Sequence, residues 1–213
     1  MPNRQEIRSE ETKRAILTAA GTLFADRGYD AVTMREIAKA AGCSHTTIYI
    51  YFKDKEALLH QLSMEPLQSL KTQMESVLGN ETLSTDDRLK SITKQFIEFC
   101  LANRNMYTVF FMTKAARVDE EAPASELNKL RNQLFGMLRK AIQEALNLRQ
   151  DFSDLGLAYA RIYFFTLQGI LATYHQSEES VDALVDRLSS TFNLAIDVLL
   201  AGFKETAKGA SSK

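Results

Sequence analysis

The sequence predicts an all-α protein, with a small N-terminal head over residues 1–53 and a larger helical body over residues 54–213. Hydrophobic residues recur at helical spacing along most of the chain, and no segment shows the strict apolar–polar alternation of a half-exposed strand. Three prolines and nine glycines are few for the many turns that strands need. Periodicity and the scarcity of turn residues therefore both indicate helices.

The first predicted helix carries an apolar stripe that would face the rest of the head, made by Ile16, Ala20, Leu23 and Phe24. Gly28 is predicted to end this helix, because glycine readily adopts the left-handed conformation that closes helices. Residues 1–10 are polar and charged, so we expect a solvated, mobile arm before the helix.

The next segment contains two short predicted helices joined by a tight turn. Thr33 and Glu36 have the spacing of a capping box, which marks a helix start. Gly42 ends that helix after Ala41, and Ser44 is placed to cap the following one. Ala38 is small enough for the two helices to cross closely. This combination of caps, small residue and turn glycine predicts a helix-turn-helix.

The second of these helices presents polar residues in its first turn, the part that reaches base edges in a helix-turn-helix. Tyr49 and Tyr51 carry hydroxyls suited to phosphate oxygens, although either ring is also suited to the core. Arg35 can bond guanine with two N–H groups, and phosphate or solvent is its alternative. The predicted DNA-contacting residues are Thr33, Arg35, Ser44, His45, Thr46, Thr47, Tyr49, Tyr51 and Lys55. Arg4 and Arg8 on the arm are expected to face solvent, with DNA as the alternative.

A longer helix is predicted to begin after Asp54, which is placed to cap it, and to run to Leu78. Lys55 adds positive charge to a helix end whose backbone N–H groups already favour anions, so we expect a phosphate contact there. Pro66 removes a backbone hydrogen bond within this helix, which predicts a kink or a break.

Residues 12–62 resemble the TetR family of one-component transcriptional regulators. The family's pattern is filled by Ala20, Leu23, Phe24, Gly28, Tyr29, Thr33, Ile37, Ala38, Ala41, Gly42, Ser44, Thr47, Ile48, Tyr49, Phe52, Lys55, Glu56, Ala57 and Leu58. Cys43 replaces the usual valine, a mild change because a buried thiol behaves as a small hydrophobic group. Thr46 and Ile50 stand where many members carry other residues, so operator preference is expected to differ there. The resemblance implies a DNA-binding head, a ligand-binding helical body and a homodimer.

The body is predicted to contain further helices near residues 84–103, 105–117, 124–147, 154–175 and 180–203, followed by a frayed tail over 204–213. Between Leu155 and Tyr174 the only charged side chain is Arg161, which predicts a helix buried on nearly all sides. The last helix has an apolar seam at four-three spacing, made by Val181, Val185, Leu188, Phe192, Ala195 and Leu199. In the family that this chain resembles, the last two helices form a four-helix dimer interface; an intramolecular core is the alternative.

The body also concentrates aromatic residues, and ligand pockets are mostly apolar with a few polar groups. The predicted ligand-binding residues are Phe96, Phe99, Tyr107, Phe110, Phe111, Phe135, Tyr159, Tyr163 and Gln168, with plain core packing as the competing interpretation of each. Nothing in this set indicates a charged ligand, so we expect an apolar or aromatic effector.

Composition excludes several classes of protein. No run of eighteen apolar residues and no apolar N-terminal segment is present, so we expect a cytoplasmic protein rather than a secreted or membrane-spanning one.

Cys43 and Cys100 lie far apart on predicted core helices, which favours free thiols over a disulfide. The net charge of −1 is low for a DNA-binding protein and predicts modest non-specific affinity. The three histidines lie on separate segments without metal-ligand spacing or a nucleophile motif, so we expect neither an enzyme nor a metal or cofactor.

The sequence therefore predicts a sequence-specific transcriptional regulator that binds a pseudo-palindromic operator as a homodimer through its last two helices. Release from DNA by a small apolar or aromatic ligand is the expected form of control, and repression rather than activation is implied by the resemblance alone. The alternative is a DNA-binding regulator that has no small-molecule effector and is controlled by a protein partner or by its own abundance.

Overall fold

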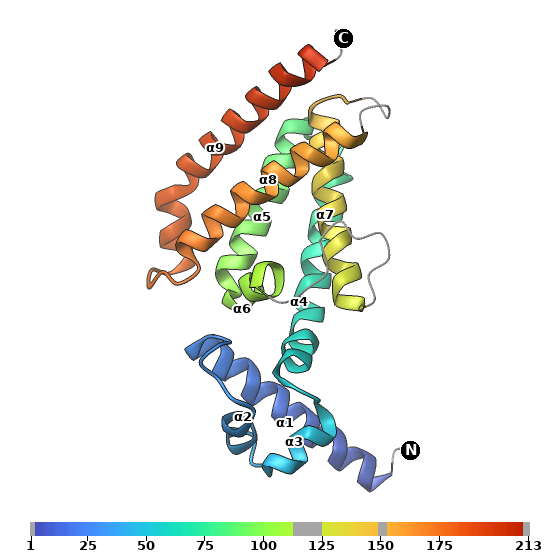
Figure 1. The fold of residues 1–213 in the computed structure, drawn as a ribbon, viewed down its shortest axis with the longest axis vertical. Coiled ribbons are helices and arrows are strands. Elements are labelled where there is room, and N and C mark those ends of the chain that lie inside the picture. The colour runs from blue at the N-terminus through green and yellow to red at the C-terminus, as the bar shows by residue number, and fades with distance from the viewer. Residues whose placement is uncertain (1–2, 113–124, 149–152, 211–213) are drawn as a thin grey trace. The chain divides into compact units, whose positions relative to one another are not determined.

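The structure, a computed structural model, describes residues 3–112, 125–148 and 153–210, and these residues form helices and no strand (Figure 1). The all-α prediction is confirmed. Contacts divide the chain into two compact units. The unit that we call the head contains residues 3–66 and 103–112, and the unit that we call the body contains residues 67–102, 125–148 and 153–210. The head thus includes two segments, residues 54–66 and 103–112, that the sequence pattern assigns to the body.

Helix α1 (Arg4–Arg27) begins much earlier than its apolar stripe predicts. Asn3 and Glu6 form a capping box, in which the Glu6 carboxylate accepts the Asn3 backbone N–H at 2.7 Å. The expectation of a mobile arm is therefore wrong from residue 4 onward. The capping box begins the helix in a polar segment that has no apolar stripe to pack against the rest of the head. The helix ends as predicted at Gly28, whose φ is 77° and whose N–H donates to the Phe24 carbonyl.

Helices α2 (Met34–Ala40) and α3 (His45–Tyr51) complete the helical core of the head, where α1 contacts α2 and α2 contacts α3 (Figure 1). The short helix α6 (Arg104–Tyr107) also contacts α1 and continues into a π-helical turn, η1 (Thr108–Met112). The fully buried side chains at the centre of the head include Ile16, Ala20, Phe24, Ile37 and Ile48. The predicted helix over 105–117 is thus replaced by α6 and η1 as far as residue 112, and its remainder lies outside the described residues.

Helix α4 (Lys55–Leu78) runs through Pro66 as one element, so of the predicted kink or break the break is wrong and the kink stays a prediction. The division between head and body nevertheless falls directly after Pro66. Proline cannot donate the backbone hydrogen bond that would tie this turn to the preceding one. Both units therefore share one helix, and the turn that lacks a backbone hydrogen bond lies at the boundary between them.

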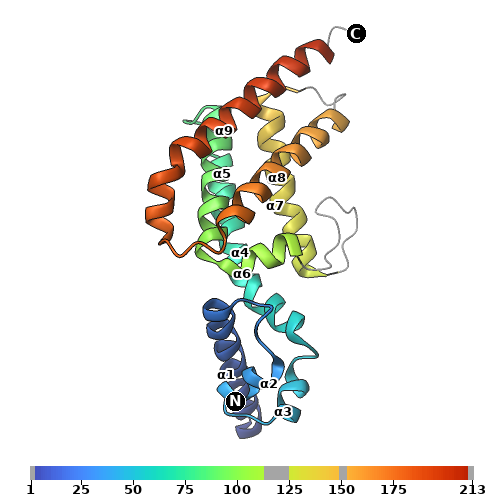
Figure 2. The same ribbon diagram turned by 60° about the vertical axis from the view of Figure 1, so that its left-hand side comes forward.

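In the body, helix α5 (Thr85–Ala102) contacts α7 (Glu126–Ala145), α8 (Ser153–Tyr174) and α9 (Val181–Ala210), as Figure 2 shows. Two ion pairs, Lys90 with Asp197 and Lys204 with Asp86, join α5 to α9. Helix α9 continues to Ala210, so the predicted frayed tail is wrong over residues 204–210. Phe203 and Ala207 are buried there, which gives this last part of the helix a packing partner.

Candidate nucleic-acid interface and effector region

The start of α2 is held by the predicted capping box. The Glu36 carboxylate accepts the Thr33 backbone N–H at 2.9 Å, and the Thr33 hydroxyl oxygen accepts the Glu36 N–H at 3.3 Å. Arg27 at the end of α1 adds a hydrogen bond and an ion pair to Glu36 at 2.8 Å. The Thr33 hydroxyl, the Arg27 side chain and the Thr33 backbone together lower the pKa of Glu36 from 4.5 to about 2.

Glu36 is therefore expected to contribute to the acid dependence of head stability. Because its pKa is lower in the folded protein than in the unfolded chain, its stabilising effect is present above pH 4.5 and is lost as the pH falls toward about 2. Glu36→Gln keeps the geometry of the cap but removes the titration, so its melting temperature should fall less steeply than that of the wild type across this window. Thermal denaturation of both proteins at several pH values measures the difference, and parallel curves would contradict the prediction.

The turn between α2 and α3 has the predicted geometry. Gly42 has a φ of 69°, and the Cys43 N–H donates to the Ala38 carbonyl at 3.0 Å, which closes the end of α2. The Ser44 hydroxyl then accepts the Thr47 N–H at 3.0 Å and begins α3. Local hydrogen bonds on both sides of the turn therefore fix the direction in which α3 leaves it.

Helix α3 has one buried side and one fully exposed ridge. Ile48 is 0% exposed, whereas Tyr49 is 46% and Ile50 is 76% exposed. At about 100° per residue, Thr46 and Ile50 lie opposite Ile48 and form the outermost ridge of the helix. His45 and Tyr49 form one flank of that ridge, with their rings 5.2 Å apart in an edge-to-face arrangement. We call Thr46 and Ile50 the outer ridge of α3.

The other predicted DNA-contacting residues fall into two groups. Arg35, His45, Thr46 and Tyr49 are exposed, so their side chains are accessible to DNA. The hydroxyls of Thr33, Ser44 and Thr47 take part in the caps of α2 and α3. The Tyr51 hydroxyl accepts a hydrogen bond from Ser9 on α1 at 3.3 Å, which orients its ring.

Lys55 is held inside the head rather than extended from it. Its ammonium group donates to the carbonyl oxygens of Tyr29 at 2.6 Å and Val32 at 2.9 Å, and lies 4.2 Å from the centre of the Tyr29 ring. These bonds tie the first turn of α4 to the loop between α1 and α2. A phosphate contact by Lys55 stays a prediction, and it is limited to the remaining N–H of the ammonium group.

A groove of about 580 Å³ beside α3 brings Tyr51 together with residues of the N-terminal segment. It is lined by Asn3, Gln5, Glu6, Arg8, Ser9, Thr12 and Tyr51. Arg4 and Arg8 lie along this side of α1, and within the described residues neither forms an ion pair. The signal that reveals this arrangement is the Asn3–Glu6 capping box, which makes the arm a rigid helix.

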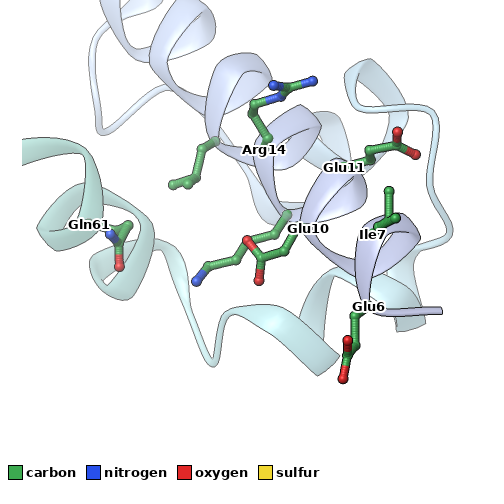
Figure 3. A pocket seen from close by; sticks show the side chains of 8 residues that line it. Glu6, Ile7, Glu10, Glu11, Arg14 and Gln61 are labelled. Carbon is green, nitrogen blue, oxygen red and sulfur yellow. The ribbon is translucent and has the colours of Figure 1, made fainter. Parts of the chain in front are cut away.

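The opposite side of α1 borders a second groove of about 700 Å³, into which Gln61 of α4 also projects (Figure 3). Glu10, Arg14 and Leu17 line this groove, and α3 contributes no residue to it. Acidic and basic side chains line both grooves, with Glu10 and Arg14 here and Glu6 and Arg8 next to Tyr51.

The predicted ligand-binding residues are divided between the two units. Phe96, Phe99, Phe135, Tyr159, Tyr163 and Gln168 belong to the body, whereas Tyr107, Phe110 and Phe111 group with the head. Phe135 and Phe164 stack edge to face at 5.7 Å, and Phe111 contacts the rings of Tyr107 and Phe110. The body therefore holds one aromatic set and the 103–112 segment another.

Two of the predicted ligand-binding residues, Tyr163 and Tyr159, form hydrogen bonds within the body through their hydroxyl groups. The buried Tyr163 hydroxyl lies 2.8 Å from the Thr93 hydroxyl, which in turn donates to the Leu89 carbonyl. Burial raises the pKa of Tyr163, so it is neutral at physiological pH. Tyr159 lies 2.7 Å from the Thr206 hydroxyl and stacks on Phe203 at 4.5 Å. These contacts link α8 to α5 and α9. A ligand that binds the Tyr159 or Tyr163 hydroxyl would therefore have to replace an existing hydrogen bond.

The sequence pattern also missed Arg131, which lies on α7 and is 4% exposed. Its guanidinium donates to the Asn128 side chain at 3.1 Å, and burial lowers its pKa to about 10. It therefore keeps its positive charge at neutral pH. Arg131 is buried on the same helix as Leu127, Leu130 and Leu134. Hydrophobic periodicity could not indicate this cation, because that pattern marks only apolar residues.

Large apolar side chains remain exposed on the last two helices. They are Ile162 and Phe165 on α8, and Leu194 and Val198 on α9, with exposures from 44% to 63%. Helix α8 is long and apolar enough to cross a membrane, and 33% of its most apolar stretch is buried. The prediction that α8 is buried on nearly all sides is therefore wrong for the single chain, because its contacts with α5, α7 and α9 leave Ile162 and Phe165 exposed.

Residues 16–62, which contain the helix-turn-helix described above, match the family model for bacterial regulatory proteins of the tetR family. The chain is a TetR-family transcriptional regulator. A relative that spans nearly all of this regulator is the fatty acid metabolism regulator protein of Bacillus subtilis. It is 25% identical over 88% of this chain and 93% of its own length. The transcriptional repressor KstR2 of Mycolicibacterium smegmatis is 30% identical over 49% of this chain and 50% of its own length.

Solved structures share the fold of this TetR-family chain from head to body. FadR from Bacillus subtilis, in complex with stearoyl-CoA, aligns with a TM-score of 0.58 over 89% of this chain and 98% of its own, at 20% identity. The ketosteroid regulator KstR2 of Mycobacterium tuberculosis aligns with a TM-score of 0.61 over 89% and 93% of the two chains, also at 20% identity. At these identities the alignments show the fold alone.

Proposed function

We propose that this TetR-family regulator is a homodimeric repressor that leaves its operator when a largely apolar small molecule binds the body. The observation that carries the DNA-binding part is the outer ridge of α3, which projects polar and apolar groups into solvent from a helix capped by Ser44. The buried Ile48 anchors the other side of that helix in the head. Such a regulator would act in the cytoplasm, where its DNA lies.

The exposed apolar residues of α8 and α9 support a dimer. Exposed apolar surface of this kind is usually covered by another protein surface. A second copy that covers Ile162, Phe165, Leu194 and Val198 removes them from water without changing the single-chain core. Two-fold symmetry then places two α3 helices on successive major grooves, about 34–36 Å apart, of a pseudo-palindromic operator.

The identity of the relatives supports a ligand with a long apolar part. The Bacillus subtilis relative is a fatty acid metabolism regulator, and the FadR structure with the same fold contains stearoyl-CoA. The aromatic set of the body, with Phe135 and Phe164 in contact, suits an acyl chain. Because α4 belongs to both units, it can transmit a ligand-dependent change to the head if the ligand prefers one of two arrangements.

The proposal is tested by selecting genomic DNA fragments with the purified protein and then challenging the complex with ligands. An enriched inverted repeat is the expected result, and flat recovery would overturn DNA recognition by the free protein. Octanoyl-, palmitoyl- and stearoyl-CoA are then added to the complex, with free CoA and the matching free fatty acids as controls. Release by a long acyl chain, together with a rise in melting temperature, supports the effector; no release by any of them favours control by a protein partner or by abundance.

The groove beside α3 predicts a phosphate contact from Arg8. Arg8→Gln should weaken binding equally to all DNA sequences and reduce the slope of log affinity against log salt by about 0.9 for each protomer, because each lost phosphate contact retains its counterions. Arg14→Gln is the matched control, since Arg14 is exposed on the same helix but borders the opposite groove (Figure 3). Equal slopes for wild type and Arg8→Gln would exclude the contact.

A further inference from the structure

We infer that Ile50 is a specificity-determining residue that contacts a thymine methyl group in each half of the operator. The inference rests on the proposed function, because it presumes that α3 lies in a major groove. It goes further by assigning a base to one side chain and by making an aliphatic group, rather than a hydrogen-bonding group, responsible for the selection.

The position of Ile50 separates it from the rest of the head. It is 76% exposed, the highest value among the large exposed hydrophobic residues described, and it lies opposite the fully buried Ile48 on the same short helix. The head therefore gains nothing from packing Ile50. A large aliphatic side chain at the centre of an otherwise polar surface is the kind of exposed group that marks a contact.

The neighbours of Ile50 show what kind of surface it meets. Thr46 lies one turn earlier on the same ridge, and its methyl group extends the apolar strip while its hydroxyl can bond a base edge. Tyr49 is 46% exposed on one flank, and Tyr51 on the other flank is oriented by Ser9. Hydroxyl groups suited to phosphate or base oxygens thus surround a central apolar contact.

The chemistry of the major groove leaves one partner for that contact. Isoleucine has neither a donor nor an acceptor, so it cannot bond the exposed edges of guanine, adenine or cytosine. The thymine C5-methyl group is the apolar feature that base pairs present in this groove. Ile50 is therefore expected to favour a thymine and to disfavour a pair whose polar edge it would shield from water without bonding it.

The experiment removes the methyl group from DNA instead of changing the protein alone. Each thymine of one operator half-site is replaced in turn by uracil, which differs only in lacking the methyl, and the affinity of wild type and Ile50→Ala is measured. At one position uracil should weaken wild-type binding about fourfold, or roughly fifteenfold when both half-sites carry it, as expected for the loss of one buried methyl-sized group per half-site. Ile50→Ala should not distinguish thymine from uracil at that position, while other positions behave as in the wild type.

Ile50→Val retains a smaller apolar group and is expected to show an intermediate preference. If no thymine position is sensitive in the wild type, or if Ile50→Ala keeps the same preference at every position, the inference is overturned. Failure of the wild type to bind any inverted repeat would instead refute the proposed function, so the two failures are distinguishable. Melting temperatures of all three proteins confirm that the comparison concerns folded heads.

Discussion

Phe165→Asp is expected to convert the protein to a monomer and to weaken binding to a full operator by a hundredfold or more. Phe165 is 63% exposed on α8, and the proposed dimer covers it with the second copy. An ionised aspartate there would have to be desolvated in the interface without a partner. Operator affinity falls because the second head no longer binds at the high local concentration that the dimer provides.

Sedimentation equilibrium measures the oligomeric state, and titration of the full operator measures the affinity. A single half-site serves as an internal control, because Phe165→Asp should bind it as the wild type does. Ile7→Asp is the matched variant, since Ile7 is 47% exposed on α1, a helix that is not part of the proposed interface, and should leave the dimer intact. A dimeric Phe165→Asp protein would show that α8 does not form the interface.

Ile48→Ala is expected to destabilise the head by about 2–5 kcal/mol, whereas Ile50→Ala should change its stability by less than about 0.5 kcal/mol. The two residues have the same side chain on the same helix, but Ile48 is 0% and Ile50 is 76% exposed. Removing Ile48 leaves a cavity in the contact between α3 and the rest of the head, which a small unit cannot easily fill.

Chemical denaturation of each variant provides the free energy of unfolding. DNA binding gives a second comparison, in which the two variants should lose affinity in different ways. Ile48→Ala should lose affinity for all sequences in proportion to the unfolded fraction of the head. Ile50→Ala should stay folded and lose affinity chiefly at the thymine position described above. Equal stabilities for the two variants would mean that α3 is turned differently in solution.

The local signals of the head could be read from the sequence because they involve neighbours along the chain. Thr33 with Glu36, Gly42 and Ser44 each act on near neighbours in the chain, so their spacing alone predicts where α2 begins and ends and where α3 begins. The Asn3–Glu6 box is equally local, and it was missed because the first turns of α1 lack an apolar stripe. Capping by itself proves sufficient to begin a helix there.

The roles of several site residues depend on contacts that spacing does not encode. Lys55 bonds carbonyl groups 26 and 23 residues earlier in the chain, and Tyr51 bonds Ser9 from 42 residues away. The sequence pattern suggests that both side chains are free to bind phosphate. In the folded head, Lys55 instead bonds the loop between α1 and α2, and Tyr51 is oriented by its hydrogen bond with Ser9. Arg8 differs in the opposite direction. The sequence pattern predicts that it faces solvent, whereas the helical start of α1 places it in the same groove as Tyr51.

The sequence by itself determined the helical class and the helix-turn-helix, because helical periodicity and capping are properties of short segments. The apolar stripe of the first helix already indicated its buried side, but only the tertiary structure decided which of the other apolar side chains face water. It placed Ile48 in the core and Ile50 outside, and it left Phe165 exposed on a helix whose composition predicts burial. The physical reason is that burial depends on which surfaces meet across long separations, and an apolar side chain is compatible with a core, a partner subunit or a thymine methyl group.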